Sequence, residues 1–394
     1  MKRLIMILIA YVPVLFACTS AVISGKATPD GRPLLWKHRD TGSLENTLVY
    51  IDTKGYAFTG VSNVSDSLNE DIWMGINERG FAIMNTASYN INLAIPKELE
   101  KDSEGKFMRL ALETCEYVDD FEKLLLENSG QWGLAANFGV IDAEGNAAFF
   151  ETGYDHYIKY DVNDPETAPE GYLIRTNFSL AGKNDKGQGY IRYDATAALF
   201  GTRKTFTPEF IIQEGTRNLD HGVMKEHIGN MRLPGNRNDR TLVSFQDYIT
   251  RYWSASVCVM QGVLPGEDPQ NSVIWTIMGF PLTAMTVPVF FASRDILPEV
   301  ISKSGGEVPL MTEAALKLKA DLFPLQHDDH ANYLDVAPLM NRKRDGYLQV
   351  VEKKEAEIIR HFQRVKENPD SVSVLAYYEW LDAYVREVYK ELLP

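Results

Sequence analysis

The cysteine at position 18 directly follows a segment with the composition of a secretory leader. Residues 1–17 read MKRLIMILIAYVPVLFA, with two basic residues, an uncharged apolar run and a small final residue. The run is shorter than the ~20 apolar residues that a membrane-spanning helix needs, so the segment is predicted to be a signal peptide. Cleavage after Ala17 would make Cys18 the first residue of the mature protein.

An N-terminal cysteine supports two different chemistries. Its thiol can act as a nucleophile, with the residue's own freed α-amine taking the thiol proton. The ordinary pKa values of the two groups, ~8.5 and ~7.7–8.0, are close, so this proton transfer costs little free energy. Alternatively, the thiol is acylated and anchors a lipoprotein. Residues 15–18 (LFAC) fit lipoprotein processing except at the bulky Phe16, and the leader alone leaves both chemistries open.

The residues that follow Cys18 favour a cysteine built into the fold. Residues 19–25 are small and β-branched, Asp30 and Gly31 form a turn signal, and a second apolar run follows. This pattern predicts a hairpin whose second strand returns Lys37, His38, Arg39 and Asp40 to the side of Cys18. A cation there would lower the thiol pKa, and a carboxylate could orient the amine. A lipoprotein would instead have a flexible polar tether at this point.

The elements that must position these residues are mainly strands. Strand pairs are predicted at residues 48–52 with 56–61, 72–76 with 81–86 and 135–142 with 147–152, a short strand at 172–176, and a later series at 256–263, 272–278 and 285–292. Helical periodicity appears at residues 107–127, around 241–252 and over much of 313–393. The pattern indicates an α+β protein with a signal peptide at 1–17, a catalytic domain at 18–300 and a helical extension at 301–394 packed on it.

Composition excludes several classes of protein. A content of 45% hydrophobic and 24% charged residues in 394 rules out a disordered or polytopic membrane chain. The formal charge of −14 gives no basic surface for nucleic acid. Cys115 and Cys258 lie in apolar segments and are predicted to be core residues, and the three cysteines form no metal-binding pair. No metal or cofactor is expected.

Five motifs in order resemble one enzyme superfamily, the N-terminal nucleophile (Ntn) hydrolases related to choloylglycine hydrolase. This group includes bile salt hydrolase, penicillin V acylase, acid ceramidase and the acyl-CoA:6-aminopenicillanate acyltransferase-like proteins. The motifs are Cys18-Thr19-Ser20 with Asp30-Gly31, Lys37 and Asp40; residues 74–82 (MGINERGFA); residues 137–143 (NFGVIDA) with Gly145 and Glu151; residues 175–178 (RTNF); and residues 233–235 (LPG) before Arg237 and Arg240. The resemblance covers Cys18 to about Ala292.

The resemblance implies a four-layer αββα sandwich of two antiparallel sheets that cleaves linear amide C–N bonds. Carried over by position, Cys18 is the nucleophile and base, Asp40 holds the amine, and Asn177 donates to the oxyanion. Lys37 aligns with an arginine of the family, whereas Arg39 stands two positions on, so either cation could flank the thiol. The late arginine falls on Arg237 or Arg240, with Arg240 preferred. Asn85 and Asn137 are the further substrate or oxyanion candidates.

Three hypotheses therefore remain from the sequence. The first is an exported amidase, periplasmic or secreted, acting on a small N-acyl amino acid, conjugated bile salt or acylated amine through a thioester. The second is an acyltransferase that uses the same Cys18 thioester. The third is a non-catalytic lipoprotein, and membrane association is expected only if Cys18 is lipidated. The helical tail is a candidate interface for a homo-oligomer, and the substrate cannot be named from the sequence.

Overall fold

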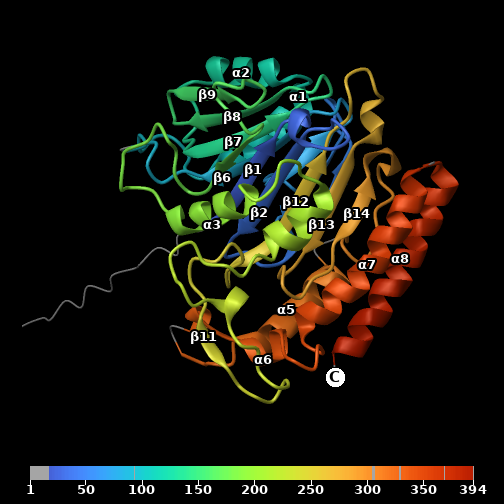
Figure 1. The fold of residues 1–394 in the computed structure, drawn as a ribbon. Coiled ribbons are helices and arrows are strands. Elements are labelled where there is room, and N and C mark those ends of the chain that lie inside the picture. The colour runs from blue at the N-terminus through green and yellow to red at the C-terminus, as the bar shows by residue number, and fades with distance from the viewer. Residues whose placement is uncertain (1–16, 93, 304–306, 328–329, 368, 394) are drawn as a thin grey trace, which may run out of the picture.

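Two antiparallel sheets lie face to face in the computed structural model, with helices on both outer faces (Figure 1). The structure describes residues 17–92, 94–303, 307–327, 330–367 and 369–393. The predicted leader therefore lies outside the described residues except for Ala17. The layer order helix, sheet, sheet, helix confirms the predicted αββα sandwich. Among the described residues, no helix is both long enough and apolar enough to cross a membrane.

The first sheet has six strands in the order β10-β1-β2-β12-β13-β14, and the second has seven in the order β3 to β9. The first comprises β1 (Thr19–Ile23), β2 (Leu34–Asp40), β10 (Tyr172–Arg175), β12 (Ser254–Gln261), β13 (Val273–Met278) and β14 (Val287–Phe290). The second comprises β3 (Asn46–Ile51), β4 (Phe58–Asn63), β5 (Met74–Asn77), β6 (Ala82–Ala87), β7 (Ala136–Ile141), β8 (Ala147–Thr152) and β9 (Tyr157–Asp161). A small separate sheet pairs β11 (Leu242–Ser244) with β15 (Tyr333–Asp335).

The predicted N-terminal hairpin is confirmed and occupies the middle of the first sheet. β1 pairs with β2 in a register that sets Ser20 opposite Lys37 and Thr19 opposite His38. Directly paired residues point to the same face of a sheet. Continued by one residue, this register sets Cys18 opposite Arg39, on the face that Lys37 shares. β2 also pairs with β12, so both edges of β2 are covered.

The two sheets pack closely where β7 crosses the hairpin. Gly139 on β7 has no side chain, and a Cβ atom there would lie 2.8 Å from Val22 Cγ2 and 2.3 Å from Met84 Cε. A glycine is required at this point because any other residue would force the sheets apart. The motif at residues 137–143 therefore includes a packing residue as well as polar ones.

Two helices cover the outer face of the second sheet. They are α1 (Glu104–Thr114) and α2 (Val118–Glu127), and they bury an aromatic cluster that includes Phe107 and Phe121. The sequence predicts one helix over residues 107–127, and the structure divides it. The Asp120 carboxylate accepts hydrogen bonds from the backbone N–H groups of Glu116 and Tyr117, at 3.0 and 2.9 Å, which starts a new helix there.

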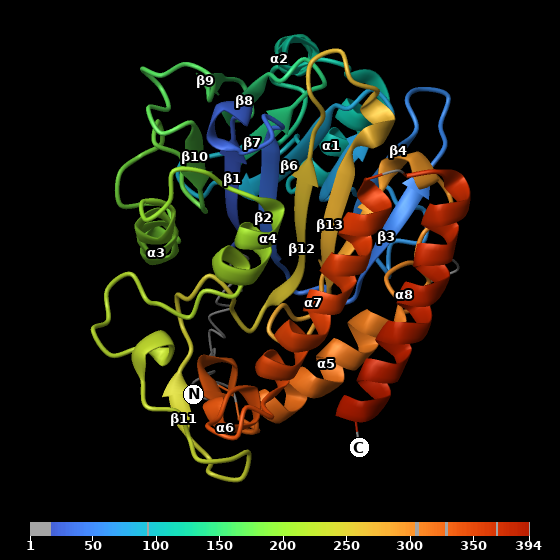
Figure 2. The same ribbon diagram turned by 45° about the vertical axis from the view of Figure 1, so that its right-hand side comes forward.

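The other outer face is covered by helices from the second half of the chain (Figure 2). They are α3 (Tyr190–Phe200), α4 (Pro208–Phe210), α5 (Leu310–Leu322), α6 (Val336–Leu339), α7 (Tyr347–Lys366) and α8 (Ser371–Leu392). The predicted helix around 241–252 is wrong, because this segment forms β11 and an irregular loop. Its buried Phe245, Tyr248 and Ile249 imitate a helical period, but Asp247 has a left-handed φ of 60° that interrupts a helix.

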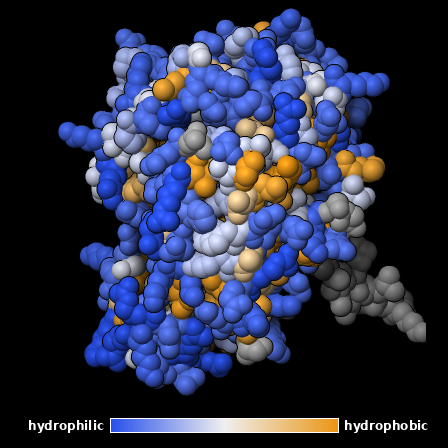
Figure 3. Space-filling view, turned by 90° about the vertical axis from the view of Figure 1, so that its right-hand side faces the viewer, coloured by the Kyte–Doolittle hydropathy of each residue, from blue (hydrophilic) through white to orange (hydrophobic). Residues whose placement is uncertain are grey.

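The C-terminal helices are attached to the sandwich through a buried ion pair. Glu355 of α7 accepts two hydrogen bonds from the Arg217 guanidinium, at 2.9 and 2.6 Å, and both side chains are fully buried. Glu355 also accepts a hydrogen bond from the backbone N–H of Thr286, just before β14. On the outside, the face carrying α7 and α8 is mostly hydrophilic, with apolar side chains gathered near its middle (Figure 3).

Candidate active site

Cys18 lies immediately before β1, between the layers of the molecule. Its side chain is buried, with 8% exposure, and its Sγ is 3.9 Å from the backbone oxygen of Asp40. The hairpin therefore brings the predicted nucleophile and the predicted carboxylate-bearing residue together, as expected. The peptide link to Ala17 is present in the described chain, and Ala17 is buried as well.

Lys37 points from β2 towards the second sheet, on the same face as Cys18. Its Nζ donates to the backbone oxygen of Trp73 at 2.7 Å and to Asn85 Oδ1 at 2.6 Å. Complete burial lowers the pKa of Lys37 to about 7, although the Cys18 thiol nearby acts in the opposite direction. The hydrogen bond from Lys37 occupies the side-chain oxygen of Asn85, so the Nδ2 group of Asn85 remains available as a donor.

Arg39 lies two residues further on the same face of β2. Its Nη1 donates to Asn46 Oδ1 at 2.7 Å and to Asn63 Oδ1 at 3.0 Å, and its guanidinium lies 4.6 Å from the ring centroid of Trp73. Burial lowers the pKa of Arg39 to about 10, again opposed by Cys18. The sequence leaves open whether Lys37 or Arg39 flanks the thiol, and the structure brings both to this region.

Asp40 is a buried carboxylate with one oxygen left without a hydrogen bond. Ser254 Oγ donates to its Oδ1 at 2.6 Å, while Oδ2 has no hydrogen-bond partner among the described residues. The Nε of Arg251 lies 3.6 Å from Oδ2, and His38 Nδ1 lies 3.6 Å from Oδ1. Burial alone would raise the pKa of Asp40, but the nearby His38 ring and the charge of Arg251 hold it below its usual value.

Asn177 is fully buried and is connected to Cys18 through an arginine that sequence reasoning missed. Arg192 of α3 donates through Nη2 to Asn177 Oδ1 at 2.9 Å and through Nη1 to the Cys18 backbone oxygen at 2.6 Å. It also donates to Thr19 Oγ1 at 2.8 Å. Burial lowers the pKa of Arg192 to about 10. Asn177 Nδ2 donates to Ala87 O at 2.9 Å, which leaves one N–H of this amide for another acceptor.

Asn137 is fully engaged in holding the chain segment that carries Asn177. Its Nδ2 contacts Thr86 Oγ1, Thr176 O and Phe178 O at 3.1–3.2 Å, and its Oδ1 accepts from Ser179 Oγ at 2.6 Å. Because both N–H donors of this amide are used, it has no donor left for an oxyanion. The sequence-based expectation of a substrate contact at Asn137 is therefore corrected to a structural role.

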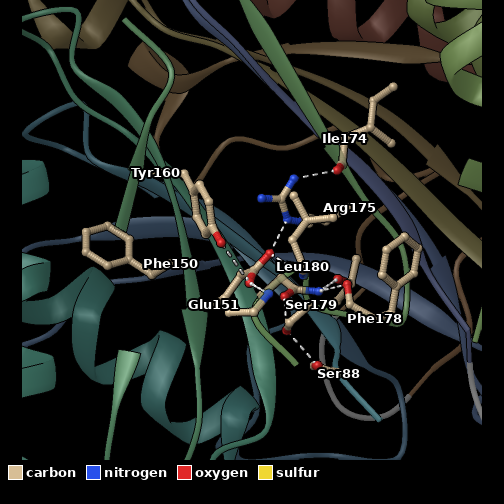
Figure 4. Close-up of polar contacts among 12 residues, drawn as sticks. Ser88, Phe150, Glu151, Tyr160, Ile174, Arg175, Phe178, Ser179 and Leu180 are labelled. Carbon is tan, nitrogen blue, oxygen red and sulfur yellow. Dashed lines mark hydrogen bonds and ion pairs between the residues drawn. The ribbon is translucent and has the colours of Figure 1, made fainter. Parts of the chain in front are cut away.

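The turn behind Asn177 is fixed by Glu151 of β8 (Figure 4). Glu151 Oε1 accepts from Arg175 Nε at 2.7 Å and from the backbone N–H of Leu180 at 2.8 Å. Its Oε2 accepts from the backbone N–H of Ala181 at 2.8 Å. Figure 4 also shows Ser179 reaching Ser88, at 2.7 Å between the hydroxyl oxygens. The motifs in the sequence thus include residues, Glu151 and Arg175, that support the turn at Asn177 and do not contact Cys18.

The predicted late arginine does not join this group. Arg240 is 65% exposed and lies 3.6 Å from Asp335 of the small sheet. Arg237, the other candidate, pairs with Asp345 and lies 4.8 Å from the ring centroid of Tyr347. Both arginines belong to a polar loop on the surface, because Asn236 and Asp239 form a tight turn there. The arginines near Cys18 and Asp40 are instead Arg192 and Arg251.

One sequence signal could have indicated Arg192. The segment 190–200 reads YIRYDATAALF, in which an arginine stands among alanines and aromatic residues. A charged residue in such a short apolar helix is either solvent-exposed or paired in the interior. Arg251 gives no comparable signal, because it follows an irregular loop whose path depends on tertiary contacts.

Stacked antiparallel sheets between helical layers, with a cysteine at the start of a central strand, are the arrangement that the resemblance to the Ntn hydrolases implies. Residues 32–198 match the family model described as acyl-coenzyme A:6-aminopenicillanic acid acyl-transferase. The match agrees with the resemblance found in the sequence and covers less than half of the chain. It includes Lys37, Asp40, Asn177 and Arg192, and it begins after Cys18. Comparison with curated proteins gave no match.

Several solved structures are similar to the chain at low identity. An N-acylethanolamine-hydrolyzing acid amidase ortholog from Caenorhabditis elegans is 15% identical, with a TM-score of 0.42, and the match covers 66% of this chain and 99% of that one. A variant of conjugated bile acid hydrolase from Clostridium perfringens is 12% identical, with a TM-score of 0.37 and coverage of 70% and 93%. Penicillin V acylase from Agrobacterium tumefaciens is 11% identical, with a TM-score of 0.34 and coverage of 70% and 86%.

Proposed function

We propose that the protein is a cysteine Ntn amidase that cleaves linear amides of small molecules through a thioester on Cys18. The observation that carries the proposal is the pairing of Cys18 with Asp40. Sγ lies 3.9 Å from the Asp40 backbone, and the Asp40 carboxylate is buried with Oδ2 lacking a hydrogen bond. Removal of residues 1–17 would create an α-ammonium or amine beside this carboxylate. Such a group would satisfy a buried acceptor that is otherwise costly to leave unpaired.

The acylation step uses the thiol and the amine of the same residue. Sγ attacks the substrate carbonyl carbon, and its proton moves to the Cys18 α-amine, which Asp40 orients. As the tetrahedral intermediate collapses, the C–N bond breaks and the leaving nitrogen takes the proton from the α-ammonium. The products of this step are a free amine and a thioester between the acyl group and Cys18.

The deacylation step regenerates the enzyme with water. The α-amine removes a proton from a water molecule, whose oxygen attacks the thioester carbonyl, and the C–S bond then breaks. Sγ leaves as a thiolate and recovers the proton from the α-ammonium, while the acyl group departs as a carboxylic acid. The positive charges of Lys37, Arg39 and Arg192 favour the thiolate both when it attacks in the acylation step and when it leaves in the deacylation step.

Two amide side chains are the candidate oxyanion donors. Asn177 keeps one N–H after its bond to Ala87 O, and Arg192 fixes its orientation from the oxygen side. Asn85 has its oxygen held by Lys37, which directs its NH₂ group away from that lysine. Removing one donor of this kind lowers kcat by ~10²–10³-fold in well-studied enzymes. Asn177→Ala and Asn85→Ala are expected to fall in that range.

The decisive experiment compares two versions of the protein that differ by one residue. One begins at Cys18, and the other begins at Ala17, which converts the amine into an amide. Because the amine is the proposed general base, the extra alanine should lower kcat/KM towards a panel of N-acyl amides by ~10²–10⁴-fold. Equal activity of the two versions would contradict the proposal.

Cys18→Ala and Cys18→Ser serve as matched controls for the nucleophile. Both should abolish turnover while leaving the unfolding midpoint close to that of the parent protein, since the side chain is small. Mass spectrometry of the exported protein tests the lipoprotein alternative in the same preparation. A free Cys18 that reacts with iodoacetamide supports the amidase, whereas a diacylglyceryl adduct on Cys18 rules it out.

An acyltransferase is the second candidate function, because the matching family model carries that description. The same Cys18 thioester would then be intercepted by an amine instead of water. Adding a nucleophilic amine to the reaction distinguishes the two activities. Product that shifts to the new amide at millimolar amine indicates acyl transfer, and product that remains the free acid indicates hydrolysis.

A further inference from the structure

Positive charge is concentrated around Cys18 in a protein that is acidic as a whole. The chain carries 54 acidic and 40 basic residues. Near Cys18, however, Lys37, Arg39 and Arg192 are buried cations, and none forms an ion pair with a carboxylate among the described residues. Asp40 has Arg251 as an additional neighbour. The three arginines outnumber the two negative groups there, the Asp40 carboxylate and a Cys18 thiolate, so a further negative charge from the substrate would be favoured.

Arg251 is the member of this group whose side chain lines a cavity. Its Nε lies 3.6 Å from Asp40 Oδ2, and its guanidinium has no other ion pair and no hydrogen bond among the described residues. The side chain is 20% exposed and lines a cavity of about 170 Å³. Other residues that line it include Gln246, Asp247, Tyr252, Trp253 and Asn332.

The cavity lies directly against the end of the strand that carries Asp40. The backbone N–H of Thr41 donates to Trp253 O at 2.9 Å, and the backbone N–H of Phe245 donates to Asn332 O at 2.7 Å. The first bond fixes one wall of the cavity relative to the end of β2, and the second joins that wall to the segment around Asn332. Its volume is well below the ~300–1,000 Å³ of a site for a whole drug-sized ligand, so it suits one small polar group of a larger substrate.

A second, independent observation is a buried basic group in contact with the wall of this cavity. Lys319 of α5 is 3% exposed, and its Nζ has no hydrogen-bond partner among the described residues. The Nζ lies 3.6 Å from the ring centroid of Tyr252, which itself lines the cavity. A buried ammonium is costly without an anion, and a cation–π contact compensates only part of that cost.

We propose that this cavity, lined by Arg251 and backed by Lys319, binds an anionic group of the amide substrate. A carboxylate is the simplest such group, since a guanidinium binds it through two parallel hydrogen bonds. This inference rests on the proposed amidase function and narrows its substrates to amides that carry a carboxylate. Asp247 also lines the cavity, and its negative charge moderates the attraction.

The test uses pairs of substrates that differ only in charge. An N-acylglycine is compared with the corresponding N-acylglycinamide, which places the carboxylate on the amine portion. An N-benzylsuccinamic acid is compared with its primary amide, which places it on the acyl portion. For at least one pair, the parent protein should show a ~10- to 100-fold higher kcat/KM for the charged member, the range of a charge-assisted hydrogen bond.

Three variants should change this charge preference in different directions. Arg251→Gln should bring the ratio of the two kcat/KM values close to one, even if loss of the Asp40 contact lowers both. Lys319→Met should reduce the ratio by less, because Tyr252 lies between its amine and the cavity. Asp247→Asn should increase it. Arg240→Gln, a surface arginine outside the site, is the control that should leave the ratio unchanged.

Binding to the Cys18→Ala protein separates this inference from the proposed function. Calorimetry should show that the N-acylglycine or the succinamic acid binds with a Kd at least ~10-fold lower than that of its uncharged partner. Equal Kd values in both pairs, or a preference that survives Arg251→Gln, would overturn the anion site. Charge-dependent binding without turnover of any amide by the parent protein would instead overturn the amidase function and leave the anion site standing.

Discussion

Two groups of buried cations in this protein are held in opposite ways. Arg217, which joins the sandwich to α7, makes a two-point ion pair with Glu355 and donates to two backbone oxygens, Pro281 O and Ala284 O. Near Cys18, by contrast, Lys37, Arg39 and Arg192 donate to asparagine and backbone oxygens. Arg217 is thus neutralised where it lies, whereas the basic groups near Cys18 have no carboxylate as a hydrogen-bond partner among the described residues.

The pKa values reflect the same difference. Burial would lower the pKa of Arg217, but the adjacent Glu355 carboxylate raises it above its usual value. The pKa of Lys37 is lowered to about 7, and those of Arg39 and Arg192 to about 10, because burial outweighs any attraction there. A cation neutralised by a carboxylate stabilises the fold, whereas one bonded only to amide oxygens remains available to a thiolate or an oxyanion.

The largest expected effect on stability comes from breaking the neutralised pair. Arg217→Met leaves the Glu355 carboxylate buried without its partner, which should lower the free energy of unfolding by ~3–5 kcal/mol. Denaturant unfolding of the folded variant measures this loss. The specific activity of the protein that remains folded should be close to that of the parent, since Arg217 does not touch the group around Cys18.

The double variant Arg217→Met with Glu355→Leu sharpens this prediction. Replacing both charges with apolar side chains of similar size removes the unpaired carboxylate, so most of the lost stability should return. A double variant as unstable as Arg217→Met alone would mean that packing, and not the unpaired charge, dominates at this position.

The next largest effect is expected on catalysis at Arg192. Arg192→Met removes the donor that orients Asn177 and holds the Cys18 backbone oxygen. kcat should fall by ~10²-fold, equivalent to ~2.7 kcal/mol in the activation barrier, while KM changes little. Steady-state kinetics with one amide substrate measure both constants. Arg192→Lys should recover part of the loss, because an ammonium cannot reach both Asn177 Oδ1 and the Cys18 backbone oxygen at once.

The sequence predicted the parts of this site that depend on local order. The hairpin from Cys18 to Asp40 is predictable because its strands alternate regularly and its turn contains Asp30 and Gly31. Arg251 was not predictable, because the loop before β12 has a helix-like period. Arg192 was missed because α3 has little amphipathic pattern, although an arginine in that short apolar helix was a signal. Asn137 was assigned to the substrate because a sequence does not reveal how many hydrogen bonds an amide already makes.

A smaller effect concerns the pH dependence of stability, through Lys319. Burial lowers the pKa of Lys319 from 10.5 to about 7 in the folded protein. Between these values the unfolded chain binds more protons than the folded one, so the stability contribution rises with pH and is lowest below pH 7. One such group contributes a slope of up to ~1.4 kcal/mol per pH unit.

Lys319→Met should remove this contribution from the pH profile. Unfolding free energies at pH 6, 7.5 and 9 should therefore rise less steeply with pH in the variant than in the parent protein. Lys37 has a lowered pKa as well and acts in the same direction, so part of the slope should remain. Identical slopes in the two proteins would mean that Lys319 keeps its proton in the fold through an anion close to it.

The smallest effect is expected at Arg240, the arginine that the sequence favoured and the structure leaves on the surface. Its 3.6 Å contact with Asp335 is made by a side chain that is 65% exposed, so solvent screens it. Arg240→Gln should change the free energy of unfolding by less than ~1 kcal/mol and leave kcat/KM unaltered. If this variant loses activity as Arg192→Met does, the loop at 236–240 must close over Cys18 when substrate binds. Arg240 would then belong, when substrate is bound, to the cations that are available to Cys18.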